Sequence, residues 1–162
     1  MAKADDAALR EQLVALLKGG QAHATVSDAV AHFPAKRIHE RPAALPYSAW
    51  QLLEHMRITL HDLLEFATNS EYVELEWPSG YWPQNAGPEK GESWESTVKA
   101  ILADLKSFEA LVSSPDSNLY AAIPWGKNNE TLLREVLLAA DHTSYHVGEL
   151  ILLRRVLGIW KS

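Results

Sequence analysis

The residues best suited to chemistry in this chain are two histidines four positions apart, in the stretch Asp141-His142-Thr143-Ser144-Tyr145-His146. On an α-helix, positions i and i+4 lie about 6 Å apart along the axis and about 40° apart around it. Both imidazoles can therefore bind one metal ion, provided that another part of the chain supplies a third ligand. Neutral imidazole nitrogens bind zinc, nickel, iron or copper, and three such ligands leave a position open for water or substrate.

Two upstream histidines are candidates for the third ligand. His55 and His61 lie near opposite edges of the apolar face of one predicted helix. The residue pattern alone leaves the choice between them open. The remaining histidines are interpreted as surface or structural residues because they lie in or near predicted loops: His23, His32 and His39.

Glu149 follows His146 by one helical turn and is a candidate for a supporting role. Its carboxylate could orient a metal-binding imidazole or serve as a general base. The alternative is that the histidines are hydrogen-bonded core residues, since this spacing also arises by chance. The pair lies on the apolar side of its helix, however, where imidazoles without a metal need buried partners.

The elements that must position these residues are predicted to be helices. Hydrophobic periodicity predicts four main helices, over residues 5–18, 48–68, 92–112 and 131–157. A short extra helix begins at the capping box of Thr25 and Asp28 and ends before Pro34. The pattern predicts no convincing strand pair. We therefore expect an all-α bundle that forms a single domain over residues 1–162.

Residues 69–91 form the longest irregular segment and are rich in aromatic side chains, including Trp77, Tyr81 and Trp82. Large aromatic residues gain free energy by packing, which argues against disorder. Two interpretations remain open: these residues form a lid or substrate-pocket wall over the metal site, or they anchor a long crossover onto the helices. Trp125, just ahead of the last helix, has the same two interpretations.

The charge and composition exclude several classes of function. The chain carries 15 Lys+Arg against 21 Asp+Glu, a net charge of -6, and shows no basic cluster larger than a pair. We therefore expect no nucleic-acid partner. There is no cysteine, so thiolate metal sites and disulfides are excluded. The sequence has neither a signal-peptide pattern nor a membrane span, and we expect a cytoplasmic protein without a membrane partner.

Two motifs together resemble those of the DinB/YfiT-like superfamily of metal-dependent enzymes. They are Trp50-Gln51-Leu52-Leu53-Glu54-His55 on the second long helix and Asp141-His142-Thr143-Ser144-Tyr145-His146-Val147-Gly148-Glu149-Leu150 on the last. The family pattern has one histidine on the earlier helix and an H-x-x-x-H pair on the later one. The resemblance covers roughly residues 5–157.

The resemblance implies a four-helix bundle of uncommon connection order, often dimeric, with a short extra helix and a long crossover. By position it makes His55, His142 and His146 the ligands of a divalent metal, with His61 as the runner-up. Zinc or nickel are the first choices, and iron or manganese the next. Gly148 is expected to permit close helix packing beside the site. The predicted last helix is apolar around most of its circumference, which suggests burial on several sides or a subunit interface.

The resemblance implies a small-molecule substrate but does not select a reaction. Some relatives resemble transferases or isomerases that use an external low-molecular-weight thiol, and others are called hydrolases. We therefore expect a metal-dependent hydrolase or thiol-dependent S-transferase, with Tyr81, Trp82 and Trp125 as pocket residues. The alternative from a different class is a non-catalytic, metal-containing binding or stress-associated module. A purely structural bundle that dimerises through its last helix is a third reading.

Overall fold

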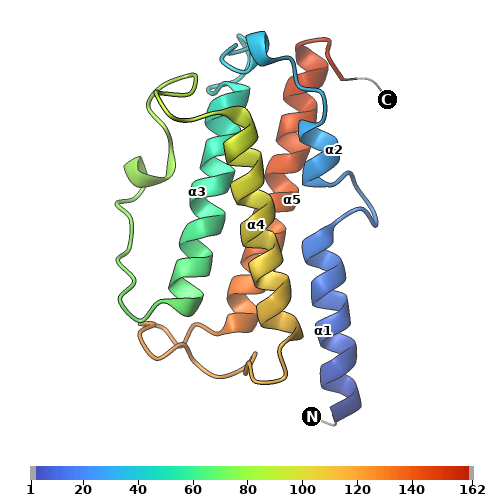
Figure 1. The fold of residues 1–162 in the computed structure, drawn as a ribbon, viewed down its shortest axis with the longest axis vertical. Coiled ribbons are helices and arrows are strands. Elements are labelled where there is room, and N and C mark those ends of the chain that lie inside the picture. The colour runs from blue at the N-terminus through green and yellow to red at the C-terminus, as the bar shows by residue number, and fades with distance from the viewer. Residues whose placement is uncertain (1–2, 161–162) are drawn as a thin grey trace.

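The computed structural model describes residues 3–160, all-helical apart from turns and connections (Figure 1). The α-helices are α1 (Lys3–Lys18), α2 (Val26–Val30), α3 (Ala49–Thr68), α4 (Trp94–Ser113) and α5 (Leu132–Val156), and short 3-10 helices cover Ala35–Arg37 and Ser79–Tyr81. Within this range no strand forms, and one isolated antiparallel bridge joins Ala122 to Thr131. Of the predicted 1–162 domain, residues 1–2 and 161–162 lie outside the described residues.

The helix boundaries agree with the periodicity to within one or two residues because local capping fixes them. Ser48 accepts a hydrogen bond from the backbone of Gln51, whose side chain in turn accepts one from the backbone of Ser48. Thr25 and Asp28 form the same reciprocal pair at the start of α2. These predicted capping boxes are confirmed, and each satisfies backbone N–H groups that the first turn leaves unpaired.

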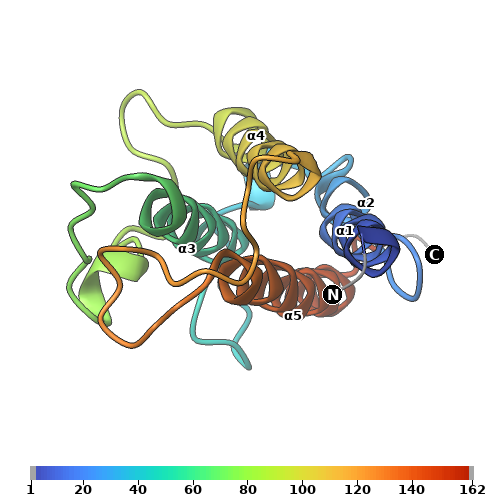
Figure 2. The ribbon, with the colours of Figure 1, turned by 90° about the horizontal axis from the view of Figure 1, so that it is seen from below.

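The four long helices lie side by side, and their directions explain the long crossover. α3 and α4 run the same way, whereas α1 and α5 run the opposite way (Figure 1). Seen along the axes, α3 contacts α4 and α5, and α1 contacts the same two helices from the other side (Figure 2). Because α3 and α4 run in the same direction, the end of α3 and the start of α4 lie at opposite ends of the bundle. Residues 69–93 therefore return along the full length of α3, about 30 Å.

The core lies between these helices and is made of large apolar side chains. α3 contributes buried side chains from more than one of its faces, because it contacts both α4 and α5 along its length. Burying such side chains supplies the main favourable term in folding. Fully or almost fully buried examples are Trp50, Leu52, Leu53, Met56, Leu60, Ile101, Phe108, Leu150 and Leu153.

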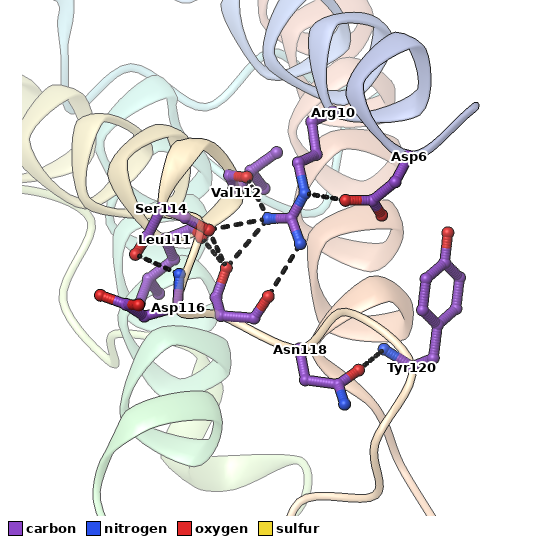
Figure 3. A network of polar contacts seen from close by, with 9 residues as sticks. Asp6, Arg10, Leu111, Val112, Ser114, Asp116, Asn118 and Tyr120 are labelled. Carbon is purple, nitrogen blue, oxygen red and sulfur yellow. Dashed lines mark hydrogen bonds and ion pairs between the residues drawn. The ribbon is translucent and has the colours of Figure 1, made fainter. Parts of the chain in front are cut away.

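Arg10 fastens α1 to the end of α4. Its Nη1 donates to the carbonyls of Val112 at 2.6 Å and Ser114 at 3.0 Å, and its Nη2 to the carbonyl of Ser117 at 2.8 Å. Asp6 holds the same guanidinium through Nε (Figure 3). The last carbonyls of a helix have no partner within it, so one arginine satisfies groups that would otherwise lack a hydrogen bond.

None of the helices within residues 3–160 combines the length and the apolar character that a membrane crossing requires.

Candidate metal centre

Three histidines from two antiparallel helices converge on one point. His55 lies in the second turn of α3, and His142 and His146 lie on the facing side of α5. The Nε2 atoms are 3.1 Å apart for His55 and His142, 3.2 Å for His55 and His146, and 3.0 Å for His142 and His146. The structure thus brings together the three residues that the sequence singled out.

The outer ring nitrogens of two of these histidines have acceptors that set their tautomers. Nδ1 of His55 donates to the carbonyl of Tyr81 at 2.8 Å, and Nδ1 of His146 donates to the Glu149 carboxylate at 2.7 Å. A neutral imidazole that carries its proton on Nδ1 has a lone pair on Nε2. The Nε2 lone pairs of His55 and His146 therefore point at the same place. His142 can donate at most one proton to them.

The surroundings favour the neutral form of two of these imidazoles, those of His142 and His55. Burial is the main reason why the pKa of His142 is lowered to about 3, and the neighbouring His146 and His55 add to the shift. Burial likewise lowers the pKa of His55, although its hydrogen bond to Tyr81 opposes the change. Neutral imidazole is the form that binds a metal ion.

The triangle of nitrogens fits a transition-metal ion. An ion bound to three nitrogens at about 2.0–2.1 Å in tetrahedral geometry separates them by about 3.3 Å. The observed Nε2–Nε2 separations of 3.0–3.2 Å are close to that value, so the side chains need little rearrangement to bind such an ion. Two convergent lone pairs share at most one proton from His142, so at least one acceptor lacks a partner unless a cation is bound, and the donor set is suited to a divalent ion.

Glu149 lies behind His146 rather than at the point where the nitrogens converge. Its carboxylate accepts the Nδ1 hydrogen bond of His146, an arrangement that orients a metal-binding imidazole and raises its basicity. The same carboxylate, together with burial, raises the pKa of Tyr47 to about 12. Of the two predicted roles, this position favours the orienting one.

The crossover packs directly on the site. The indole of Trp82 stacks on the imidazole of His55, with ring centroids 3.9 Å apart and planes 4° apart, and the ring of Tyr47 also stacks with Trp82, at 5.6 Å between centroids. Gln51 donates to the carbonyl of Pro83, and Ser48 to that of Ala86. The crossover is thus anchored at the start of α3, and Trp82 contacts the histidine cluster, whereas a substrate pocket lined by these aromatic residues stays a prediction.

Tyr81 and Trp125 lie at a separate cavity farther along α3. The Trp125 indole donates to the carbonyl of Phe66 at 2.7 Å, and both aromatic rings line a cavity of about 360 Å³. Neither the histidines nor Trp82 belong to its lining. Of the three predicted pocket residues, Trp82 therefore contacts the histidine cluster and Trp125 does not, whereas Tyr81 reaches both places through different atoms.

The other histidines lie away from the cluster. His61, the alternative third ligand, faces α4, where its Nδ1 lies 3.2 Å from a carboxylate oxygen of Asp104. The three loop histidines are exposed, as interpreted from the sequence: His23, His32 and His39. The packing of α3 between two neighbours decides which of its histidines faces α5.

Gly148 does not pack closely against another helix of this chain. It is exposed, and a Cβ added there would meet no atom within 4 Å. The expected close packing beside the site is therefore absent within the monomer, since this face of α5 points away from the other helices.

Sequence reasoning missed two carboxylates at the cavity. Asp62 and Glu135 both line it, and Glu135 is only 1% exposed. The spacing in the sequence could have indicated both carboxylates: Asp62 follows His55 by seven residues, and Glu135 precedes His142 by seven. Seven residues make about two helical turns, so each carboxylate lies on the same face as its histidine.

Comparisons with protein-family models, with curated proteins and with solved structures find no match to this chain.

Proposed function

We propose that His55, His142 and His146 bind one divalent transition-metal ion and that the protein is a metal-dependent enzyme. The observation that carries the proposal is the convergence of the three Nε2 atoms to within 3.0–3.2 Å of one another. Zinc and nickel suit an all-imidazole site best, and iron and manganese are the next candidates.

The proposed reaction is hydrolysis or S-transfer from a low-molecular-weight thiol to a small molecule. A divalent ion at this point would act as a Lewis acid and would activate a water or an incoming thiol near neutral pH. The chain has no cysteine, so a thiol would have to come from outside. Tyr81 and Glu149 hold two of the imidazoles in the required tautomer, and Trp82 keeps water from one face of His55.

We also propose that the chain belongs to the DinB/YfiT-like superfamily and that its fold is the corresponding four-helix bundle. Three features support this: the order of the histidines, the parallel pair α3 and α4 joined by a long crossover, and the last helix that carries the H-x-x-x-H pair. A fold-level likeness is a weak argument for the reaction. The histidine geometry therefore carries the functional proposal.

The proposal includes a homodimer formed through α5. Four large apolar residues of this helix are exposed at helical spacing, on the stripe that also contains Gly148: Leu137, Tyr145, Leu152 and Val156. Two copies of α5 that cross in antiparallel orientation at Gly148 place Asp141 of one copy opposite Arg155 of the other, since each lies seven residues from the glycine. The stripe is thus complementary to itself in both shape and charge.

The metal proposal is tested on protein purified without a His-tag. We expect about one equivalent of a transition metal per chain, measured by elemental analysis, and a loss of that metal in the His142→Ala/His146→Ala variant. His61→Ala is the matched control, because His61 lies on α3 but faces α4. Equal metal content in the wild type and the double variant would rule the site out.

Activity is tested by incubating the metal-loaded protein with esters and amides, and with thiols paired with electrophiles. Turnover that is lost on chelation and restored by the metal would support the enzyme. A protein that binds and is stabilised by the metal but turns over no member of either panel would instead be the non-catalytic metal-containing module.

A further inference from the structure

The cavity of about 360 Å³ lies at one end of the bundle, where four segments meet. Its walls come from the last turns of α3, the crossover, the connection between α4 and α5, and the first turn of α5. Residues 114–131 close this end below α3 and α5. The cavity is thus built from the two helices that carry the histidines and from both long connections.

The cavity and the histidine cluster share the facing sides of α3 and α5. The two helices are antiparallel, so moving from His55 to Asp62 and from His142 back to Glu135 leads in the same direction. Two helical turns correspond to about 10 Å. Thr59 lies between His55 and Asp62 on the same face, and its buried hydroxyl has no hydrogen-bond partner.

Glu135 lines this cavity and has one carboxylate oxygen without a hydrogen-bond partner. One of its carboxylate oxygens accepts from Arg134 at 2.6 Å, whereas Oε2 is buried and has no partner. Burial raises the pKa of this carboxyl, which shows that its charge is poorly solvated. A buried acceptor without a partner costs free energy that a donor on a ligand would recover.

The cavity also has an excess of negative charge. Glu74 pairs with Lys127 at 3.1 Å, and Glu135 with Arg134. Two further carboxylates have only neutral donors: Asp62 accepts from the hydroxyls of Tyr72 and Tyr81, and Glu130 from the backbone and side chain of Asn128. Four carboxylates and two cations line the cavity, which leaves two negative charges in excess.

Aromatic rings complete the lining. Phe66, Tyr72, Tyr81 and Trp125 all contribute to the wall. Aromatic faces attract cations and also pack against alkyl chains. The combination of an unpaired carboxylate oxygen, surplus negative charge and aromatic rings suits a positively charged organic group that also carries a hydrogen-bond donor, as a primary ammonium group does.

We propose that this cavity binds the primary ammonium group of an alkylamine, with Oε2 of Glu135 accepting an N–H hydrogen bond. Along the shared face of α3 and α5 this cavity lies about 10 Å from the histidine cluster. The proposed amine site does not depend on the metal centre. The further statement that an amine is the substrate of the metal centre rests on the proposed function.

The test uses the full chain and three ligands of equal length: n-hexylammonium, 1-hexanol and hexanoate. We expect saturable binding of hexylammonium in calorimetry, with the alcohol and the carboxylate at least roughly tenfold weaker, since a charge-assisted hydrogen bond is lost. Nuclear Overhauser contacts should place the alkyl chain against the rings of Tyr81 and Trp125. Equal or tighter binding of hexanoate, or contacts confined to other rings, would overturn the proposal.

Glu135→Gln should weaken hexylammonium binding by roughly tenfold or more. Glu74→Gln is the matched control, because Glu74 lies at the same cavity but is exposed and paired with Lys127, and its effect should stay within about twofold. An unchanged affinity in Glu135→Gln also overturns the proposal. If that variant does not fold, the three ligands and the ring contacts in the wild-type protein decide.

The two proposals fail separately. Hexylammonium should still bind saturably to the chelator-treated wild type and to the His142→Ala/His146→Ala variant. If the protein contains no metal but binds the amine, the metal centre is wrong and the amine site is right. If metal binds at the histidines but hexylammonium does not bind saturably, the reverse holds.

Discussion

His146 and Glu149 form a hydrogen bond of 2.7 Å within one helix, and it turns the imidazole so that Nε2 points at His55 and His142. A three-residue spacing places the carboxylate beside the outer nitrogen without help from tertiary packing. Two of the three candidate ligands are therefore supplied by α5 alone, before α3 contributes its histidine.

Replacing Glu149 with Gln should weaken metal binding by roughly tenfold to hundredfold, because the imidazole loses a charged hydrogen-bond acceptor. Competition with a chromophoric chelator measures the affinity. Glu11→Gln, an exposed change on α1, should leave it unaltered. An affinity for Glu149→Gln equal to that of the wild type would show that the carboxylate does not support the site.

Glu135 should make the protein less stable as the pH rises. Burial raises the pKa of this carboxyl above 4.5 in the folded state. Above pH 4.5 the unfolded chain loses the proton first, so stability falls until the pH passes the folded pKa. Urea unfolding at pH 4 and pH 7 should therefore show that Glu135→Gln gains stability relative to the wild type at the higher pH, whereas Glu11→Gln shows no such trend.

Arg10→Ala should destabilise the fold by about 1–3 kcal/mol, because three carbonyls at and just after the end of α4 lose a side-chain donor. Arg10→Lys keeps the charge but lacks the planar fork, and it should recover only part of the loss. Chemical denaturation of the three proteins gives the comparison. Equal stability of the alanine variant and the wild type would contradict the role assigned to Arg10.

A charge reversal tests the proposed dimer. Arg155→Asp should raise the dissociation constant, because it places two acidic residues opposite each other across the α5 crossing. The double variant Asp141→Arg/Arg155→Asp restores opposite charges and should recover the dimer in sedimentation experiments. Lys106→Asp, on the exposed side of α4, is the control for the change in net charge. A monomeric wild type would exclude the interface.

The helices and the histidine pair could be predicted from the sequence because local rules determine them. The capping boxes at Ser48 and Thr25 depend on residues three positions apart, and the spacing of His142 and His146 is a property of any α-helix. These features require no knowledge of the neighbouring helices.

The choice of His55 over His61 could not be made from the residue pattern, because both lie at edges of the same apolar face. Only the packing of α3 between α4 and α5 assigns one edge to each neighbour. The contact of Trp82 with His55 could not be predicted either. Trp82 lies in an irregular segment, where no periodic pattern indicates which way a side chain points. Gly148 packs against no other helix of the same chain, because its open side faces away from them, and a crossing with a second copy stays a prediction.

Tyr81 belongs to both places at once, through its carbonyl at His55 and its ring at the cavity. A ligand that moves this residue must change the affinity of the histidines for a metal ion, and thermodynamic linkage requires the metal to change the affinity for that ligand by the same factor. The two sites of this small protein are therefore energetically coupled to whatever extent Tyr81 moves, with a single residue as the connection.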